Sequence, residues 1–132
     1  HHKHSFYLIR NSSLFGLSDH DLVLTALIAR YHRRAMPKPT HEAFGTLDRD
    51  DRIAVTKLAA ILRVADALDR GHTQRIRAIG VALTDGHTVI AVNNVGELSL
   101  EQLALREKGD MFEYVYGMDV ALRAAHAGDR IE

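Results

Sequence analysis

The first half of the chain carries apolar residues at helical spacing. The apolar run SFYLI predicts a first helix from the start of the chain to about Ser13, ending near Gly16, a residue suited to a left-handed cap. A second helix is predicted to begin after Ser18, which forms a capping box with Asp21, and to place His32 at its C-terminal end. The expected buried positions of this second helix are Leu24, Leu27, Ile28 and Tyr31.

A loop is predicted next, because the stretch AMPKPTHEAFGTLD contains two prolines and a glycine. Asp48 or Asp50 is then the expected N-cap of a third and longest helix, DDRIAVTKLAAILRVADALDRG, which Gly71 is expected to close. The bulky apolar residues of this helix recur at helical spacing and predict its buried stripe: Ile53, Leu58, Ile61, Leu62, Ala65 and Leu68.

The pattern changes in the second half of the chain. Two β-branched runs flank Asp85-Gly86, a dipeptide that favours a type I′ turn, so a β-hairpin is predicted. Ser99 and Gln102 suggest a second capping box, followed by a helix weakened at Gly109 and ended at Gly117. The run MDVALRAA is the expected third strand. The predicted fold is therefore α+β and mainly α, with a helical half (1–72) followed by a small ββαβ unit (73–132), both expected to pack as one domain.

Composition removes several classes of function. The chain has 132 residues, with 17 basic and 17 acidic side chains, so no net charge draws it to nucleic acid or a membrane surface. Cysteine is absent, which excludes disulfides, thiolate zinc sites and a cysteine nucleophile. No cationic-then-apolar stretch and no long apolar run appear, so we expect neither a signal peptide nor a membrane helix. The dinucleotide, P-loop, zincin and α/β-hydrolase motifs do not occur in this sequence. We expect a cytoplasmic protein without nucleic-acid or membrane partners.

The opening HHKHSFYLIRNSS looks like the start of a helix cut out of a longer protein. It has no initiator methionine, and its apolar patch arrives before any residue that could cap the helix. An expression tag is disfavoured, because Lys3 interrupts the histidines and the run continues directly into core-like sequence.

Three segments together resemble the C-terminal part of the exopolyphosphatase and guanosine pentaphosphate phosphohydrolase family. They are HHKHSFYLIRN, LIARYHRR with the P-K-P that follows, and LAAILRVADALDRGH, and their order and spacing fit as well. The resemblance covers residues 1–75 strongly and the rest more weakly. It implies a helical region similar to the HD phosphohydrolases, which in the family follows two actin-like domains that carry the hydrolysis of phosphoanhydride bonds.

The HD resemblance assigns candidate metal ligands to His1, His32 and Asp66, since imidazole and carboxylate suit a divalent metal. The His-Asp pair that names the HD proteins is missing. His20-Asp21 is a literal match, but Asp21 is better explained as a helix-capping residue. Asp66 is explained equally well by ion pairs with the arginines three residues before and four after it, and His32 by its favourable place at a helix C-terminus.

Basic residues gather around the same three segments and are candidates for contact with phosphate, whose geometry guanidinium groups match. The alternative is a solvated basic surface with no ligand. We select six as candidate phosphate-binding residues, with Arg30 and Lys38 nearby in the same group: Lys3, Arg33, Arg34, Arg63, Arg70 and His72.

The resemblance thus implies a C-terminal domain of an exopolyphosphatase-type hydrolase. Such a domain would aid the binding of polyphosphate or guanosine pentaphosphate (pppGpp) and homodimerisation in the full-length protein, while absent actin-like domains perform hydrolysis. No catalytic residue and no cofactor is expected in this chain, although the full-length protein would use Mg²⁺. Two alternatives stay open: a fragment of a divalent-metal HD phosphohydrolase, and a standalone interaction module.

Overall fold

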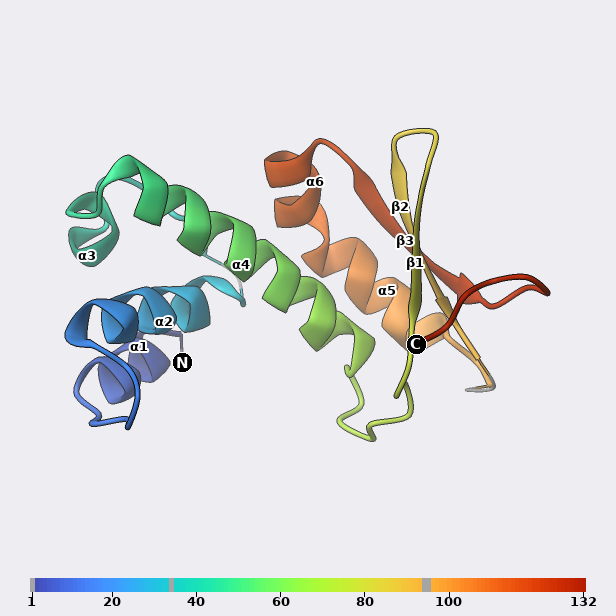
Figure 1. The fold of residues 1–132 in the computed structure, drawn as a ribbon, viewed down its shortest axis with the longest axis horizontal. Coiled ribbons are helices and arrows are strands. Elements are labelled where there is room, and N and C mark those ends of the chain that lie inside the picture. The colour runs from blue at the N-terminus through green and yellow to red at the C-terminus, as the bar shows by residue number, and fades with distance from the viewer. Residues whose placement is uncertain (1, 34, 94–95) are drawn as a thin grey trace. The chain divides into compact units, whose positions relative to one another are not determined.

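The computed structural model describes residues 2–33, 35–93 and 96–132, and Figure 1 shows its fold. The described residues form six helices and a three-stranded sheet, so the fold is α+β and mainly α, as predicted. The chain divides within its longest helix into two compact units, His1–Leu62 and Arg63–Glu132. No helix of the described residues is long and apolar enough to cross a membrane.

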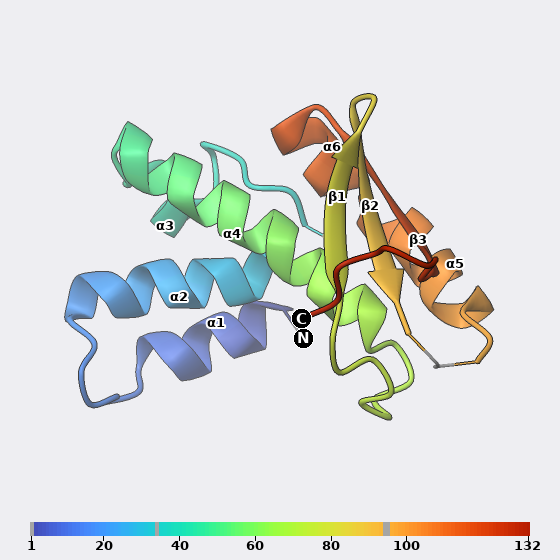
Figure 2. The ribbon, with the colours of Figure 1, turned by 45° about the vertical axis from the view of Figure 1, so that its right-hand side comes forward.

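The first unit begins with two helices, α1 (His2–Arg10) and α2 (Asp19–Tyr31), which lie side by side (Figures 1 and 2). The predicted capping box is confirmed: the Asp21 backbone N–H donates to Ser18 Oγ, and the Ser18 N–H donates to the Asp21 carboxylate. His32 is the C-cap of α2, as expected. The first helix ends at Arg10 and therefore earlier than predicted, whereas Gly16 does adopt the left-handed conformation, with φ of 86°.

The segment predicted as a loop contains a short helix, α3 (Glu42–Gly45). Phe44 of α3 is buried, and its ring meets the ring of Tyr31 edge to face at 5.7 Å between centroids. This packing stabilises a short helix in a segment whose prolines and glycine predicted a loop. Asp48 caps the next helix, α4 (Arg49–Leu68), by accepting a hydrogen bond from the Asp51 N–H.

The buried stripe predicted for α4 is wrong. Four of its bulky residues are exposed by 39–49%: Ile53, Leu58, Ile61 and Leu62; Ala65 is exposed as well, and Leu68 is half-buried. The small side chains of the helix are buried instead: Val55, Ala59, Ala60, Val64 and Ala67. The helix has apolar residues on more than one face, and small residues allow the closest approach of neighbouring backbone.

The second unit contains β1 (Gly80–Thr84), β2 (His87–Val92), α5 (Ser99–Lys108), α6 (Asp110–Tyr116) and β3 (Asp119–Ala124). β1 and β2 form the predicted hairpin, with Asp85 and Gly86 at φ of 49° and 79° in its two-residue turn. β3 pairs with the other side of β2 in parallel, and α5 and α6 supply the crossover that parallel strands need. The ββαβ order is therefore confirmed.

Three local features of this unit correct or confirm the sequence analysis. The helix breaks at Gly109 and ends at Gly117, whose φ of 70° is left-handed, as expected. Gly71 does not have a positive φ; His72 and Gln74 have one instead. The capping box expected at Ser99 and Gln102 is wrong, because the Ser99 hydroxyl donates to Glu97 and the Gln102 amide donates to the carbonyl of Leu122 on β3.

The two faces of the sheet are covered differently (Figures 1 and 2). On one face, a core joins the sheet to α5 and to the end of α4: Val64, Ala67, Ile90, Val92, Leu98, Ala104, Leu105 and Leu122. The C-terminal tail crosses the other face. It pairs with the chain just before β1 through two backbone hydrogen bonds between Ile79 and Glu132, at 3.1 and 3.2 Å.

Candidate anion-binding pocket

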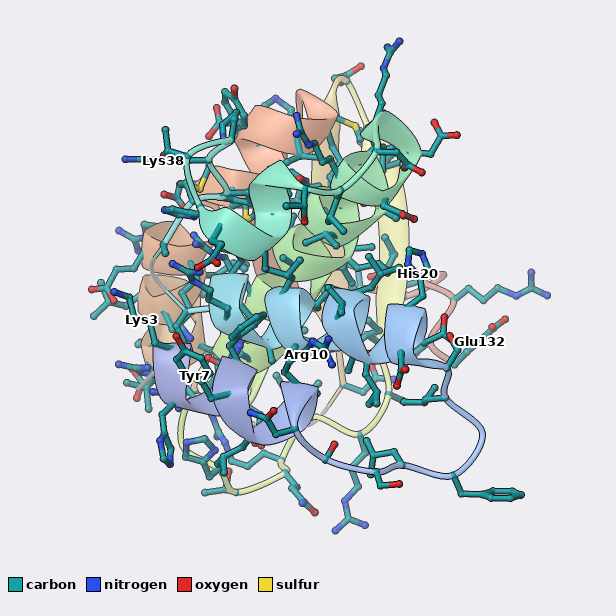
Figure 3. The ribbon with its side chains drawn as sticks, turned by 90° about the vertical axis from the view of Figure 1, so that its left-hand side faces the viewer. Lys3, Tyr7, Arg10, His20, Lys38 and Glu132 are labelled. Carbon is teal, nitrogen blue, oxygen red and sulfur yellow. The ribbon has the colours of Figure 1, made fainter. Side chains whose placement is uncertain are left out.

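One side of α1 supplies the first wall of a pocket in the first unit. Lys3, Tyr7 and Arg10 are spaced by four and three residues, which places them on one face of the helix (Figure 3). All three side chains are exposed, and the Tyr7 ring meets the ring of Phe6 edge to face at 5.5 Å. The wall therefore combines two long cationic side chains with an aromatic surface.

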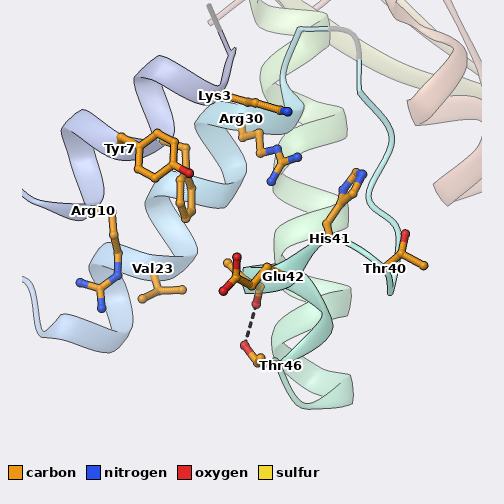
Figure 4. Close-up of a pocket in the computed structure, with 11 residues that line it drawn as sticks. Lys3, Tyr7, Arg10, Val23, Arg30, Thr40, His41, Glu42 and Thr46 are labelled. Carbon is orange, nitrogen blue, oxygen red and sulfur yellow. Dashed lines mark hydrogen bonds between the residues drawn. The ribbon is translucent and has the colours of Figure 1, made fainter.

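The remaining walls come from α2, from α3 and from the residues just before α3. Val23 and Arg30 lie on α2, and His41, Glu42 and Thr46 lie on or beside α3 (Figure 4). Together with α1 they enclose a cavity of about 650 Å³, which is large enough for a small multiply charged ligand. The whole cavity is built by the first unit.

His41 is held in this pocket by the buried Tyr31. The Tyr31 hydroxyl lies 2.6 Å from His41 Nδ1, and the two rings stack with an angle of 11° between their planes. Tyr31 is fully buried, and burial raises the pKa of its phenol, so the hydroxyl keeps its proton. The imidazole is therefore positioned by a buried group that does not ionise at neutral pH.

Positive charge dominates the electrostatics of the pocket. The pKa of His41 lies below its usual value, first because of burial and then because of the charges of Arg30, Lys38 and Lys3. Among the described residues that line the cavity, only Glu42 carries a negative charge. The pocket is thus locally cationic although the chain as a whole has no net charge.

The candidate phosphate-binding residues of the first unit are only partly gathered here. Lys3 lines the pocket, together with Arg30, whose guanidinium lies 5.4 Å from the centre of the Tyr31 ring. Arg33 is exposed just beyond α2 and is not among the lining residues. Arg34 lies outside the described residues.

The other three candidates belong to the second unit. Arg63 is buried and forms an ion pair with Asp110, at 3.3 Å between Nη1 and Oδ1. Its pKa is lowered by burial, although Asp110 opposes this effect. Arg70 and His72 are both exposed in the turns after α4. Of these three residues, Arg70 and His72 therefore have the freer access to a polyanion.

The three candidate metal ligands lie in separate parts of the chain, with His32 in the first unit and Asp66 in the second. His1 lies outside them. His32 is half-buried, and its Nδ1 lies 2.5 Å from the carbonyl oxygen of Ala29, which makes this nitrogen the protonated one. The carboxylate of Asp66 forms an ion pair with Lys108, and not with the arginines expected from helical spacing. The described part of the chain contains no group of three His, Asp or Glu side chains able to hold a metal.

Sequence reasoning missed Arg10 and His41 as residues of the pocket. Arg10 follows Lys3 by seven residues, so the helical period of the first segment was a usable signal. His41 lies in the segment interpreted as a loop, and nothing local indicates that it returns to Tyr31. His20 Nε2 lies 3.1 Å from Oδ2 of Asp51, so His20 has a structural contact of its own.

Comparison with known proteins supplies the identity. A search of curated proteins finds no match for this chain. A family match extends over residues 1–109, and the family is described as Ppx/GppA phosphatase, domain III. The matched part includes every element of the pocket and most of the second unit. The chain therefore belongs to the Ppx/GppA phosphatase family and corresponds to domain III of these exopolyphosphatase-type proteins.

Proposed function

We propose that this domain binds the phosphoanhydride substrate of an exopolyphosphatase-type hydrolase and that other domains of the full-length protein hydrolyse it. The substrate is polyphosphate or guanosine pentaphosphate. The observation that carries the proposal is the cationic pocket of the first unit, which Lys3 and Arg10 of α1 and Arg30 of α2 line together with His41. The family match supports it, since the members of this family are phosphatases.

The arrangement of the cations favours a ligand with several phosphate groups in a row. Lys3 and Arg10 are seven residues apart on α1, which corresponds to roughly 10 Å along the helix axis. Figure 4 shows Lys3, Arg30 and His41 toward one end of the pocket and Arg10 at the other. An extended polyanion can contact both ends, and guanidinium groups can donate paired hydrogen bonds to its oxygens.

Further parts of the proposal concern the rest of the protein. Arg33, Arg70 and His72 would extend the contact with a long chain of phosphates beyond the pocket. Homodimerisation, a cytoplasmic location and a need for Mg²⁺ are proposed for the full-length protein only. Within this chain, the described residues show no group of three His, Asp or Glu that fits the ion.

The experiment compares two double variants of the purified chain in binding long-chain polyphosphate. Lys3→Gln with Arg10→Gln removes two charges from the pocket, and Arg49→Gln with Arg77→Gln removes two exposed charges elsewhere. We expect the first pair to weaken binding about tenfold or more, because hydrogen bonds to charged groups contribute about 1.5–3 kcal/mol each. The second pair should change it by less than about threefold, since exposed charges contribute little.

Equal losses in the two double variants would contradict the pocket as the binding site, and the basic residues would then be a solvated surface. The same preparation also tests the division of labour. Wild-type chain should release no phosphate from polyphosphate above the level of an Asp66→Ala variant. Release that depends on Asp66 would favour a metal-dependent HD phosphohydrolase instead.

A further inference from the structure

We propose that His41 couples polyanion binding in this pocket to proton uptake, so that the imidazole is neutral in the empty pocket and charged when phosphates occupy it. The inference rests on the proposed function, because it concerns the same pocket. It adds a role for a residue outside the candidate phosphate-binding set, and it predicts that local pH regulates the affinity.

The position of the ring allows this role. His41 is half-buried at the start of α3 and lines the cavity, while its Nδ1 is engaged by the Tyr31 hydroxyl at 2.6 Å. When the hydroxyl donates to Nδ1, the proton of the neutral ring lies on Nε2, the other ring nitrogen. The neutral ring can therefore already donate one hydrogen bond to a phosphate oxygen.

A second proton can be accommodated without moving the ring. A tyrosine hydroxyl both donates and accepts, so it can accept from Nδ1–H once the imidazole is charged. Burial raises the pKa of Tyr31 and keeps this hydroxyl neutral in both states. Tyr31 thus acts as a positioning residue for His41 and is not itself expected to touch the ligand.

The charges around His41 determine the direction of the effect. Lys3 on α1, Arg30 on α2 and Lys38 before α3 are positive and act on the ring, and Glu42 on α3 is negative. Arg10 adds a further positive charge at the other end of the pocket. In the empty pocket the excess of positive charge disfavours a charged imidazole. A bound polyphosphate places several negative charges among the same groups and reverses this preference, because nearby opposite charge favours the ionised form.

The sign of the pH dependence follows from this reversal. The pKa of His41 lies below its usual value in the free protein and is higher in the complex, so the complex holds more protons between the two values. Affinity must therefore increase as the pH falls through that interval. A rise in the pKa of one unit on binding corresponds to a limiting gain of about tenfold in affinity.

The test measures binding of long-chain polyphosphate by calorimetry at about pH 6 and about pH 8, where carboxylates and lysines stay ionised. Each measurement is repeated in two buffers of different ionisation enthalpy, which gives the number of protons taken up. The variants are His41→Gln and, as a matched control, His126→Gln, an exposed histidine of the second unit. Long chains are used because their few terminal phosphates, which also titrate in this range, form a small fraction of the ligand.

At the lower pH, we expect wild-type chain and His126→Gln to bind polyphosphate about tenfold more tightly than His41→Gln binds it. Proton uptake on binding should be reduced in His41→Gln and unchanged in His126→Gln. Titration of the His41 ring protons by NMR, with and without polyphosphate, gives the same answer without a variant. Its pKa should rise on binding in wild-type protein. Tyr31→Phe should reduce the share of the ring that carries its proton on Nε2, as seen in imidazole nitrogen shifts.

Two negative outcomes are distinguishable. If the chain binds polyphosphate but His41→Gln keeps the proton uptake and pH profile of wild type, the role of His41 is overturned and the proposed function stands. If polyphosphate does not bind at either pH, the proposed function fails, and the inference that rests on it fails too.

Discussion

At the scale of single residues, the second unit depends on a buried carboxylate held by one arginine. Glu101 is 3% exposed, and its Oε1 accepts a hydrogen bond of 2.5 Å from Arg75. This bond lowers the pKa of Glu101 and outweighs the opposing effect of burial. Because a buried carboxylate without a partner is costly, Arg75 is expected to matter more for stability than its own exposure suggests.

Replacing Arg75 by glutamine should lower the free energy of unfolding by about 1–2 kcal/mol at pH 7. This value lies in the lower part of the range for a lost charged hydrogen bond, because Arg75 itself is partly exposed. The folded-state pKa of Glu101 is depressed, so the pair contributes stability above the unfolded pKa and loses it as the pH falls. Urea unfolding at pH 7 and near pH 3 should show the difference between wild type and variant shrinking in acid.

Arg77→Gln provides the matched control for this prediction, since it removes an exposed arginine two residues away. Its effect should stay within about 0.5 kcal/mol at both pH values. A variant at Arg75 that is as stable as the one at Arg77 would show that Glu101 needs no partner.

At the scale of elements, local signals predicted most boundaries. The capping box at Ser18, the cap at Asp48, the Asp85-Gly86 turn and the helix end at Gly117 depend on interactions within a few residues, and the structure confirms each of them. The box expected at Ser99 failed because its Gln102 donates to β3 instead, a partner that lies far along the sequence.

The face that a helix buries was harder to predict. The sequence of α4 offers a stripe of bulky residues that includes Ile53 and Leu58, and a second stripe of small ones that includes Ala59 and Ala60. Which stripe is buried depends on packing in the folded chain, and in the structure the small residues are buried. Prediction of the candidate site from the sequence was limited in the same way. Lys3 was predicted, but the contact that brings His41 to Tyr31 spans ten residues and leaves no periodic signal.

A substitution at Gly80 can test how the C-terminal tail is held on the sheet. A Cβ atom at this position would lie 2.3 Å from the carbonyl oxygen of Arg130, so the tail can cross the sheet only over a glycine. Gly80→Ala should therefore displace the tail and cost about 1–3 kcal/mol, as overpacking does. Hydrogen exchange at the amides of Ile79 and Glu132, which bond each other's carbonyls, should accelerate.

Gly71→Ala is the matched control for the tail. The nearest atom to a Cβ there lies at 3.6 Å, an ordinary contact, and the backbone φ is not positive. This variant should leave exchange at Ile79 and Glu132 unchanged. Equal exchange in wild type and Gly80→Ala would mean that the tail does not depend on the close approach at Gly80.

At the scale of the whole molecule, charge is balanced in total but not in its distribution. The chain has 17 basic and 17 acidic residues, yet Lys3, Arg10 and Arg30 meet in one pocket of the first unit with Glu42 as the acidic residue among the described lining. The family supplies a reason for such clustering, since its members are phosphatases. We therefore propose that this pocket is, among the described residues, the principal contact with a phosphate polymer.

The most direct test is an NMR titration of the isotope-labelled chain with long-chain polyphosphate. We expect the largest shifts at Lys3, Arg10, Arg30 and His41. These shifts should diminish as salt is added, because counterion release and screening make such contacts weaker at high salt. Shifts concentrated in the second unit, or spread evenly over all exposed basic residues, would contradict the proposal.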